Sequence, residues 1–118
     1  MKITDIKTIC LKYPYESFIA DGNSVCFGRG ALLILIETDT EIIGLGECAT
    51  FGASMSAMTD IVEHQLKGLL IGQNPLDIER LWETMVWSNF ANGRRGIVMG
   101  AISGIDIALW DIAGKAAG

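Results

Sequence analysis

The sequence predicts an α+β domain in which a three-stranded antiparallel meander is followed by three helices. Two observations support this fold class. The first half carries apolar and β-branched runs separated by turn-forming residues, which is typical of strands, whereas the second half carries apolar residues at helical spacing. Strands followed by helices pack as layers around one core, and 118 residues are enough for one such domain.

The first strand is expected from Ile3 to Tyr13, where β-branched and polar residues mix and Pro14 ends the run. Residues Tyr15–Arg29 show no period and contain the turn-forming sequence Asp21-Gly22-Asn23-Ser24. They predict a loop that is longer than most connections, and loops of this length are often functional lids or disordered.

The second and third strands are expected to form a hairpin. The apolar run Ala31–Ile36 predicts a central strand that is covered on both faces. Thr38–Glu41 is expected to turn the chain, and Ile42–Cys48 is expected to return as the third strand. Gly44 and Gly46 predict a bulge or a close approach of another backbone in this strand.

Helices are expected after the meander. Ser54 or Ser56 can cap a helix that runs to about Leu70 and ends at Gly72. The pair Asn74-Pro75 predicts the start of the next helix, because a capping residue followed by proline is typical of a helix N-terminus. A core-facing stripe at helical spacing follows this start: Ile78, Leu81, Trp82 and Met85.

The last helix is expected over residues 97–116 and combines small with bulky apolar residues. Small residues let another backbone approach closely, so this helix is expected to be buried on more than one side. Gly104 in its interior costs roughly 1 kcal/mol relative to alanine, which tight packing would offset. Asp111 and Lys115 can pair along the helix, whereas the sequence identifies no partner for Asp106.

Composition and charge exclude several classes of protein. The chain is 50% hydrophobic and 19% charged, which excludes disorder, and its net charge of −5 argues against nucleic-acid binding. No uninterrupted run of 18 apolar residues and no signal peptide are found, so no membrane segment is expected. Cys10, Cys26 and Cys48 are odd in number and far apart, which favours buried free thiols in a reducing cytoplasm.

The segment Ala101–Lys115 resembles the signature helix of the mandelate racemase/muconate lactonising branch of the enolase superfamily. It matches the family pattern of small, aliphatic, acidic and basic residues at every fixed position. The order of the elements before this helix is also similar to that of the family. It consists of a strand, a long loop, a hairpin that ends in Gly44–Glu47, and helices that contain Asn74-Pro75 and Leu81-Trp82. The segment Gly93–Gly96 resembles that of sugar-acid and hydroxyproline-type dehydratases.

The resemblance implies that residues 1–118 form the N-terminal capping domain and end where a (β/α)8 barrel would begin. The family abstracts a proton next to a carboxylate and stabilises the enediolate on Mg²⁺, which the barrel holds with three acidic ligands. We therefore expect this chain to supply no catalytic residue and no metal ligand, and to be inactive alone. Its expected partners are the barrel of the same polypeptide, a small carboxylate substrate and further copies in a homo-oligomer.

The capping domain of this family contributes two loops that close over the barrel mouth and set substrate choice. They map to Tyr15–Arg29 and Cys48–Ser54. The resemblance therefore implies that the substrate-binding wall contains five residues: Phe18, Ile19, Asp21, Thr50 and Phe51. Closing loops exclude water and favour one substrate shape. The alternative is that these are ordinary loop residues with an aromatic anchor.

Other candidate groups have simpler explanations. His64 lies among polar residues of a predicted helix, which favours a surface position, and Glu47 and Asp39 are carboxylates without a defined partner. Arg94 and Arg95 precede a helix N-terminus and could contact a substrate carboxylate. The alternative for these two arginines is an ion pair with a neighbouring domain or subunit.

The favoured function implied by the resemblance is that of a magnesium-dependent dehydratase of a sugar acid or related hydroxy acid. A racemase, epimerase or cycloisomerase is the alternative within the same chemistry. A free-standing, non-enzymatic α+β binding module is the alternative outside it.

Overall fold

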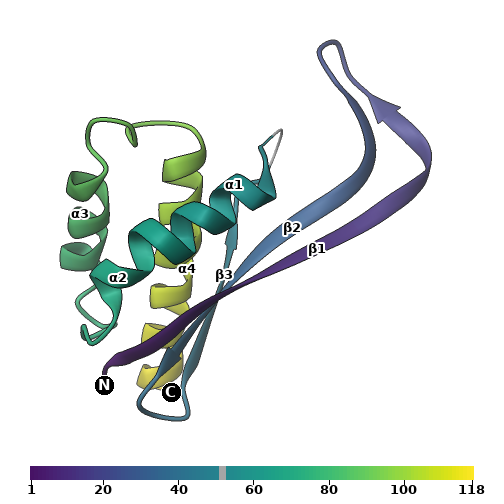
Figure 1. Cartoon of the computed structure of the whole chain (residues 1–118). Coiled ribbons are helices and arrows are strands. Elements are labelled where there is room, and N and C mark those ends of the chain that lie inside the picture. The colour runs from purple at the N-terminus through teal and green to yellow at the C-terminus, as the bar shows by residue number, and fades with distance from the viewer. Residues whose placement is uncertain (51–52) are drawn as a thin grey trace.

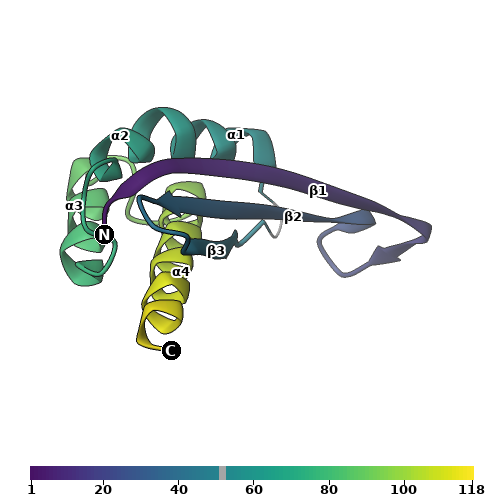
Figure 2. The same cartoon turned by 90° about the horizontal axis from the view of Figure 1, so that it is seen from below.

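The computed structural model describes residues 1–50 and 53–118 and confirms the α+β architecture (Figure 1). Three antiparallel strands form one sheet in the order β1-β2-β3. The strands are β1 (Ile3–Ala20), β2 (Val25–Thr38) and β3 (Ile43–Cys48). The helical segments are α1 (Met55–Asp60), the π-helical η1 (Ile61–Leu66), α2 (Lys67–Leu70), α3 (Ile78–Ser88) and α4 (Ile97–Ala117). The outer parts of β1 and β2 extend well beyond the helices (Figure 2).

The core lies between one face of the sheet and the helices, and its tightest contact joins β3 to α4. Alternate residues of β2 from Leu32 to Thr38 are buried, and the same face of β3 holds Gly44 and Gly46. A Cβ atom at Gly46 would lie 2.0 Å from the carbonyl oxygen of Gly104. The two backbones can approach so closely only because both positions are glycine, which confirms the predicted close approach.

The predicted pair between Asp111 and Lys115 is confirmed and also fastens α4 to β3. The Lys115 Nζ atom lies 2.6 Å from Asp111 Oδ2 and donates to the Ile43 carbonyl oxygen at 2.8 Å. The same Asp111 oxygen accepts the Leu45 N–H at 2.8 Å. The hydrogen bonds from Lys115 and Leu45 hold the pKa of Asp111 below its usual value.

The prediction of a long loop over Tyr15–Arg29 is wrong. β1 continues past Pro14, and this extension pairs with the first residues of β2 as an antiparallel ribbon. We call residues 13–29 the β-arm. Only Asp21–Ser24 connects its two strands, as the turn-forming sequence indicated. Pro14 is tolerated because β1 lies at the edge of the sheet, and the pairing register shifts directly after it, between Pro14 and Ile19.

The prediction that a helix starts at Asn74-Pro75 is also wrong, since α3 begins at Ile78. The Asn74 side chain accepts the Leu76 N–H at 3.2 Å and forms a turn of its own before the helix. The stripe of Ile78, Leu81 and Met85 is buried as predicted. Trp82 is 39% exposed rather than in the core, because it lies beside this stripe.

Two further burial predictions are wrong. β2 is the central strand, but helices cover only one of its faces, and Leu33 and Leu35 are half-buried on the other. Cys48 is buried, whereas Cys10 and Cys26 are exposed: Cys26 lies on the β-arm, and Cys10 lies at the edge strand with its Sγ atom 3.6 Å from the Thr59 hydroxyl of α1. An apolar run predicts a strand, but it does not show whether helices cover one face of that strand or both.

α4 is long and apolar enough to cross a membrane by length and composition alone, although the sequence contains no uninterrupted apolar run of that length. The core helix of a compact domain passes the same test. In this fold the apolar side of α4, which includes Ile105 and Leu109, packs into the core against the sheet.

Candidate functional site

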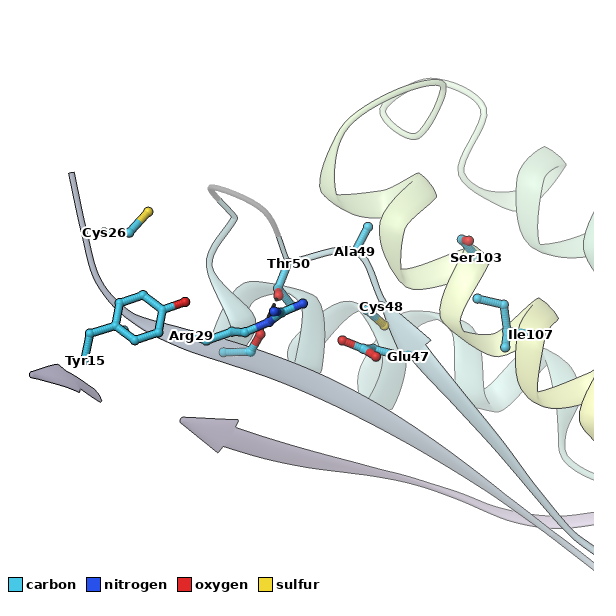
Figure 3. Close-up of a pocket in the computed structure, with 11 residues that line it drawn as sticks. Tyr15, Cys26, Arg29, Glu47, Cys48, Ala49, Thr50, Ser103 and Ile107 are labelled. Atoms are coloured by element: carbon cyan, nitrogen blue, oxygen red, sulfur yellow. Dashed lines mark hydrogen bonds between the residues drawn. The ribbon is translucent and has the colours of Figure 1, made fainter. Parts of the chain in front are cut away.

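An open concavity of about 660 Å³ lies where the base of the β-arm, the end of β3 and α4 meet (Figure 3). Three parts of the chain that are distant in sequence line it: Tyr15, Cys26, Gly28, Arg29 and Gly30; Glu47, Cys48, Ala49 and Thr50; Ser103 and Ile107. The fold therefore brings the β-arm, the segment after β3 and one side of α4 to a shared hollow.

Close contacts hold the base of the β-arm in place. The Thr50 hydroxyl donates to the carbonyl oxygen of Gly30 at 3.1 Å. A Cβ atom at Gly30 would lie 2.9 Å from the Met55 Cε atom, and one at Gly28 would lie 2.6 Å from the Tyr13 carbonyl oxygen. Glycine at both positions thus permits close packing with α1 and β1.

Charged and hydroxyl groups face this concavity. Arg29 extends into it from between the two glycines, toward Thr50 and away from Tyr15 (Figure 3). Within the described chain, no carboxylate lies within 4.0 Å of the Arg29 guanidinium, and Glu47 is not paired with it. Together with the Ser103 hydroxyl, these side chains offer donors and acceptors suited to a polyhydroxylated anion.

Cys48 lies at the inner wall of the concavity and is buried. Burial raises the pKa of its thiol to about 11, and the nearby negative charge of Glu47 adds to this effect. The thiol is therefore neutral near pH 7. Because the thiolate is the nucleophilic form of cysteine, Cys48 acts here as a packing residue.

Of the five residues predicted for the substrate wall, Thr50 lines the concavity. Phe18 and Ile19 lie farther out on the β-arm and are 63% and 60% exposed. The Phe18 ring packs against that of Phe27, with 6.4 Å between the ring centroids. Phe51 lies outside the described residues.

The fifth predicted residue, Asp21, lies at the turn of the β-arm. Its Oδ1 atom accepts the backbone N–H groups of Asn23 and Ser24, both at 2.8 Å. These hydrogen bonds lower the pKa of Asp21. The carboxylate therefore organises the turn and does not line the concavity.

Sequence reasoning did not single out most of the lining residues. One signal was available. Ser103 and Ile107 are four residues apart and therefore share one face of α4.

The described residues do not fit a magnesium site. In the ranges 1–50 and 53–118, no three His, Cys, Asp or Glu side chains gather as metal ligands would.

His64 lies on the surface, as predicted, with its side chain 71% exposed and its Nδ1 atom 3.2 Å from Asp60 Oδ1. The Arg94 guanidinium stacks on the Phe90 ring, 4.0 Å from the centroid.

A second, smaller hollow of about 320 Å³ lies between α3 and α4, and Trp82, Asp106 and Trp110 are among the residues that line it. Partial burial raises the pKa of Asp106, the acid for which the sequence identified no partner.

The sequence comparison finds relatives that are longer than this chain. Residues 28–118 match the model of the mandelate racemase/muconate lactonizing enzyme N-terminal domain. A D-galactarolactone cycloisomerase of Agrobacterium fabrum is 39% identical over 98% of the chain and 29% of its own length. A D-galactonate dehydratase of Variovorax paradoxus is 45% identical over 74% of the chain and 22% of its own length.

Solved structures give the same result. An enolase-superfamily member from Polaromonas sp. JS666 matches with a TM-score of 0.91 and 36% identity, over 99% of this chain and 31% of its own. A racemase from Streptomyces coelicolor A3(2) with bound magnesium matches with a TM-score of 0.91 and 30% identity, over 98% of this chain and 32% of its own. The chain thus spans 22% to 33% of the length of the relatives that it matches.

Proposed function

Because the chain belongs to the mandelate racemase/muconate lactonizing enzyme family, as its N-terminal domain, we propose that it caps the active site of a larger enzyme that acts on a sugar acid. The concavity between the β-arm, Thr50 and α4 carries this proposal. It presents hydroxyl groups, a guanidinium and a carboxylate, which are the groups that bind a polyhydroxylated acid.

The remaining part of the active site would come from a (β/α)8 barrel outside residues 1–118. Support for a further domain is the difference in length between this chain and its relatives. Magnesium would be bound by that domain, where it would stabilise the negative charge that develops when a proton leaves the carbon next to a carboxylate. The role of this chain is to contact the distal end of the substrate and to exclude water.

The favoured reaction is dehydration of a sugar acid, supported by the 45% identity with a D-galactonate dehydratase. The second candidate is cycloisomerisation of a sugar-acid lactone. The observation in its favour is that the D-galactarolactone cycloisomerase matches nearly the whole chain, including the β-arm.

Within this proposal, the predicted wall residues have separate positions. Thr50 would contact the substrate inside the concavity, and its hydrogen bond to Gly30 would keep it there. Phe18 and Ile19 would form an outer apolar wall on the β-arm, and Asp21 would hold the turn that shapes the arm. The wall role of Phe51 stays a prediction from the family resemblance.

The test uses the full-length protein with Mg²⁺ and a panel of six-carbon sugar acids and their lactones. Loss of a hydroxyl group as water gives a keto acid that is one water lighter than the substrate. Cycloisomerisation of a lactone breaks the bond to the ring oxygen and conserves mass, so mass spectrometry of the product separates the two reactions. We expect dehydration of at least one sugar acid by the full-length protein and none by residues 1–118 alone. Turnover of no acid or lactone, with the full-length protein folded and magnesium bound, would overturn the proposal.

A further inference from the structure

We propose that Arg29 binds a second, distal carboxylate, so that this enzyme prefers sugar diacids to sugar monoacids of the same length. This inference rests on the proposed function, and it adds the substrate class. The supporting observation is that Arg29 is the one cationic side chain among the described residues that line the concavity.

The position of Arg29 favours a ligand over a structural role. Arg29 pairs with no carboxylate of the described chain and extends into the hollow (Figure 3). Lys2, Lys12, Arg94 and Arg95 also have no carboxylate within 4.0 Å in the described chain, but none of these four lines the concavity. A guanidinium presents a planar fork of donors that matches a carboxylate in a bidentate geometry.

The neighbouring groups distinguish a diacid from a simple anion. Tyr15, Thr50 and Ser103 offer neutral hydroxyl groups, and Glu47 offers an acceptor for the hydroxyl groups of a sugar chain. A sugar diacid carries carboxylates at both ends with hydroxyl groups between them. One carboxylate would lie at the reacting carbon, and the other would reach Arg29.

The experiment compares galactarate with galactonate, which differ only at the distal carbon, where the first has a carboxylate and the second a hydroxymethyl group. The variants are Arg29→Gln, Arg29→Lys and, as a control that removes the same charge away from the concavity, Arg80→Gln on α3, where the guanidinium is partly exposed and pairs with Asp77. Each is made in the full-length protein. Both kcat/KM and the Kd by calorimetry are measured for each acid with Mg²⁺ present.

For Arg29→Gln we expect kcat/KM and affinity for galactarate to fall about 10- to 100-fold, as for the loss of a charged hydrogen-bonded pair. For galactonate the change is expected to stay below about 3-fold, because it has no distal charge to lose. Arg29→Lys should recover part of the loss by retaining the charge without the fork, and Arg80→Gln should change kcat/KM and affinity for neither acid.

Two results would overturn the inference. The first is an equal effect of Arg29→Gln on both acids, which would indicate a structural role. The second is disappearance of the galactarate effect when Arg29→Gln is combined with Glu47→Gln, since Arg29 would then act only by neutralising Glu47. The Kd values keep this test separate from the proposed reaction, because a protein that binds the acids without turnover would refute the reaction and still report on Arg29.

Discussion

β3 and the β-arm belong to the same sheet, but β3 is packed closely against α4, whereas the β-arm is largely exposed. At the β3–α4 interface, the backbones of Gly46 and Gly104 are in close contact, and Cys48 is buried. On the β-arm, large apolar side chains are exposed, and Phe27 reaches 72% exposure. The interface admits few substitutions without a change in backbone position, whereas the arm can vary and so can adapt the site to a substrate.

The strongest test of this contrast is Gly46→Ala. The added Cβ atom would lie 2.0 Å from the Gly104 carbonyl oxygen and 2.8 Å from the Ala108 nitrogen, so α4 would have to move away from β3. We expect a loss of about 3 kcal/mol or more in the local stability of α4, at the upper end of overpacking effects. Hydrogen exchange of the α4 amides in the full-length protein measures this loss.

The matched control is Gly68→Ala in α2, where nothing lies within 4 Å of the added Cβ atom. There the same substitution is expected to stabilise the helix by up to about 1 kcal/mol. Similar exchange rates in wild type and Gly46→Ala would contradict the assignment of the interface as the rigid part of the fold.

The same contrast explains which features the sequence could predict. Gly44, Gly46 and Gly104 break local propensity in a strand and a helix, and such breaks indicate close packing, which the structure confirms. The β-arm beyond Gly28 has few buried residues, so its sequence shows no apolar alternation that would identify strands. Pro14 therefore predicts a strand end, although an edge strand tolerates it.

For the candidate site, the family resemblance pointed to two of the three segments that line the concavity, but not to α4 and not to Arg29 as an individual residue. Its importance depends on α4 and the segment after β3 lying opposite it, and a single sequence does not show that arrangement.

Thiol labelling provides a second test of the contrast. The buried Cys48 has its pKa raised to about 11, whereas Cys26 on the β-arm and Cys10 are exposed. At pH 8 we expect Cys48 to react with a thiol reagent at least about 100-fold more slowly than an ordinary exposed cysteine, because little thiolate is present and access is blocked. Mass spectrometry of labelled peptides measures each rate, and all three sites should react readily in denaturant. Fast native labelling of Cys48 would show that the interface opens.

A smaller effect is expected from the ion pair that fastens α4 to β3. The folded-state pKa of Asp111 lies below its usual value of 3.8, so its stabilising contribution is complete above that value and is lost as the pH falls through the folded-state pKa. Asp111→Asn should therefore destabilise α4 by about 1 kcal/mol at pH 7, a modest figure because the pair is partly solvated.

The difference between Asp111→Asn and wild type should stay constant down to about pH 4 and shrink only below the usual pKa of 3.8, as the pH approaches the lower folded-state pKa and the wild-type carboxylate becomes protonated. Hydrogen exchange of α4, corrected for intrinsic rates and compared at pH 7 and at a series of pH values below 3.8, measures this difference. Asp39→Asn removes a carboxylate at the turn before β3 and is the control. A difference that stays constant with pH would mean that the charge of Asp111 contributes nothing.

The smallest effect on stability is expected on the β-arm itself. Phe18 is 63% exposed and touches Phe27 at a centroid distance of 6.4 Å, so Phe18→Ala should cost less than about 1 kcal/mol in the melting of the full-length protein. Leu81→Ala is the contrasting change, since that fully buried side chain should cost about 2–5 kcal/mol.

If the β-arm forms the outer wall of the substrate site, Phe18→Ala should still alter the ratio of kcat/KM values between sugar acids of different length, with magnesium affinity unchanged. Leu81→Ala should lower the stability of the protein and leave that ratio as it is. An unchanged ratio in Phe18→Ala would remove Phe18 from the wall and leave Thr50 and the base of the β-arm as the part of this chain that selects the substrate.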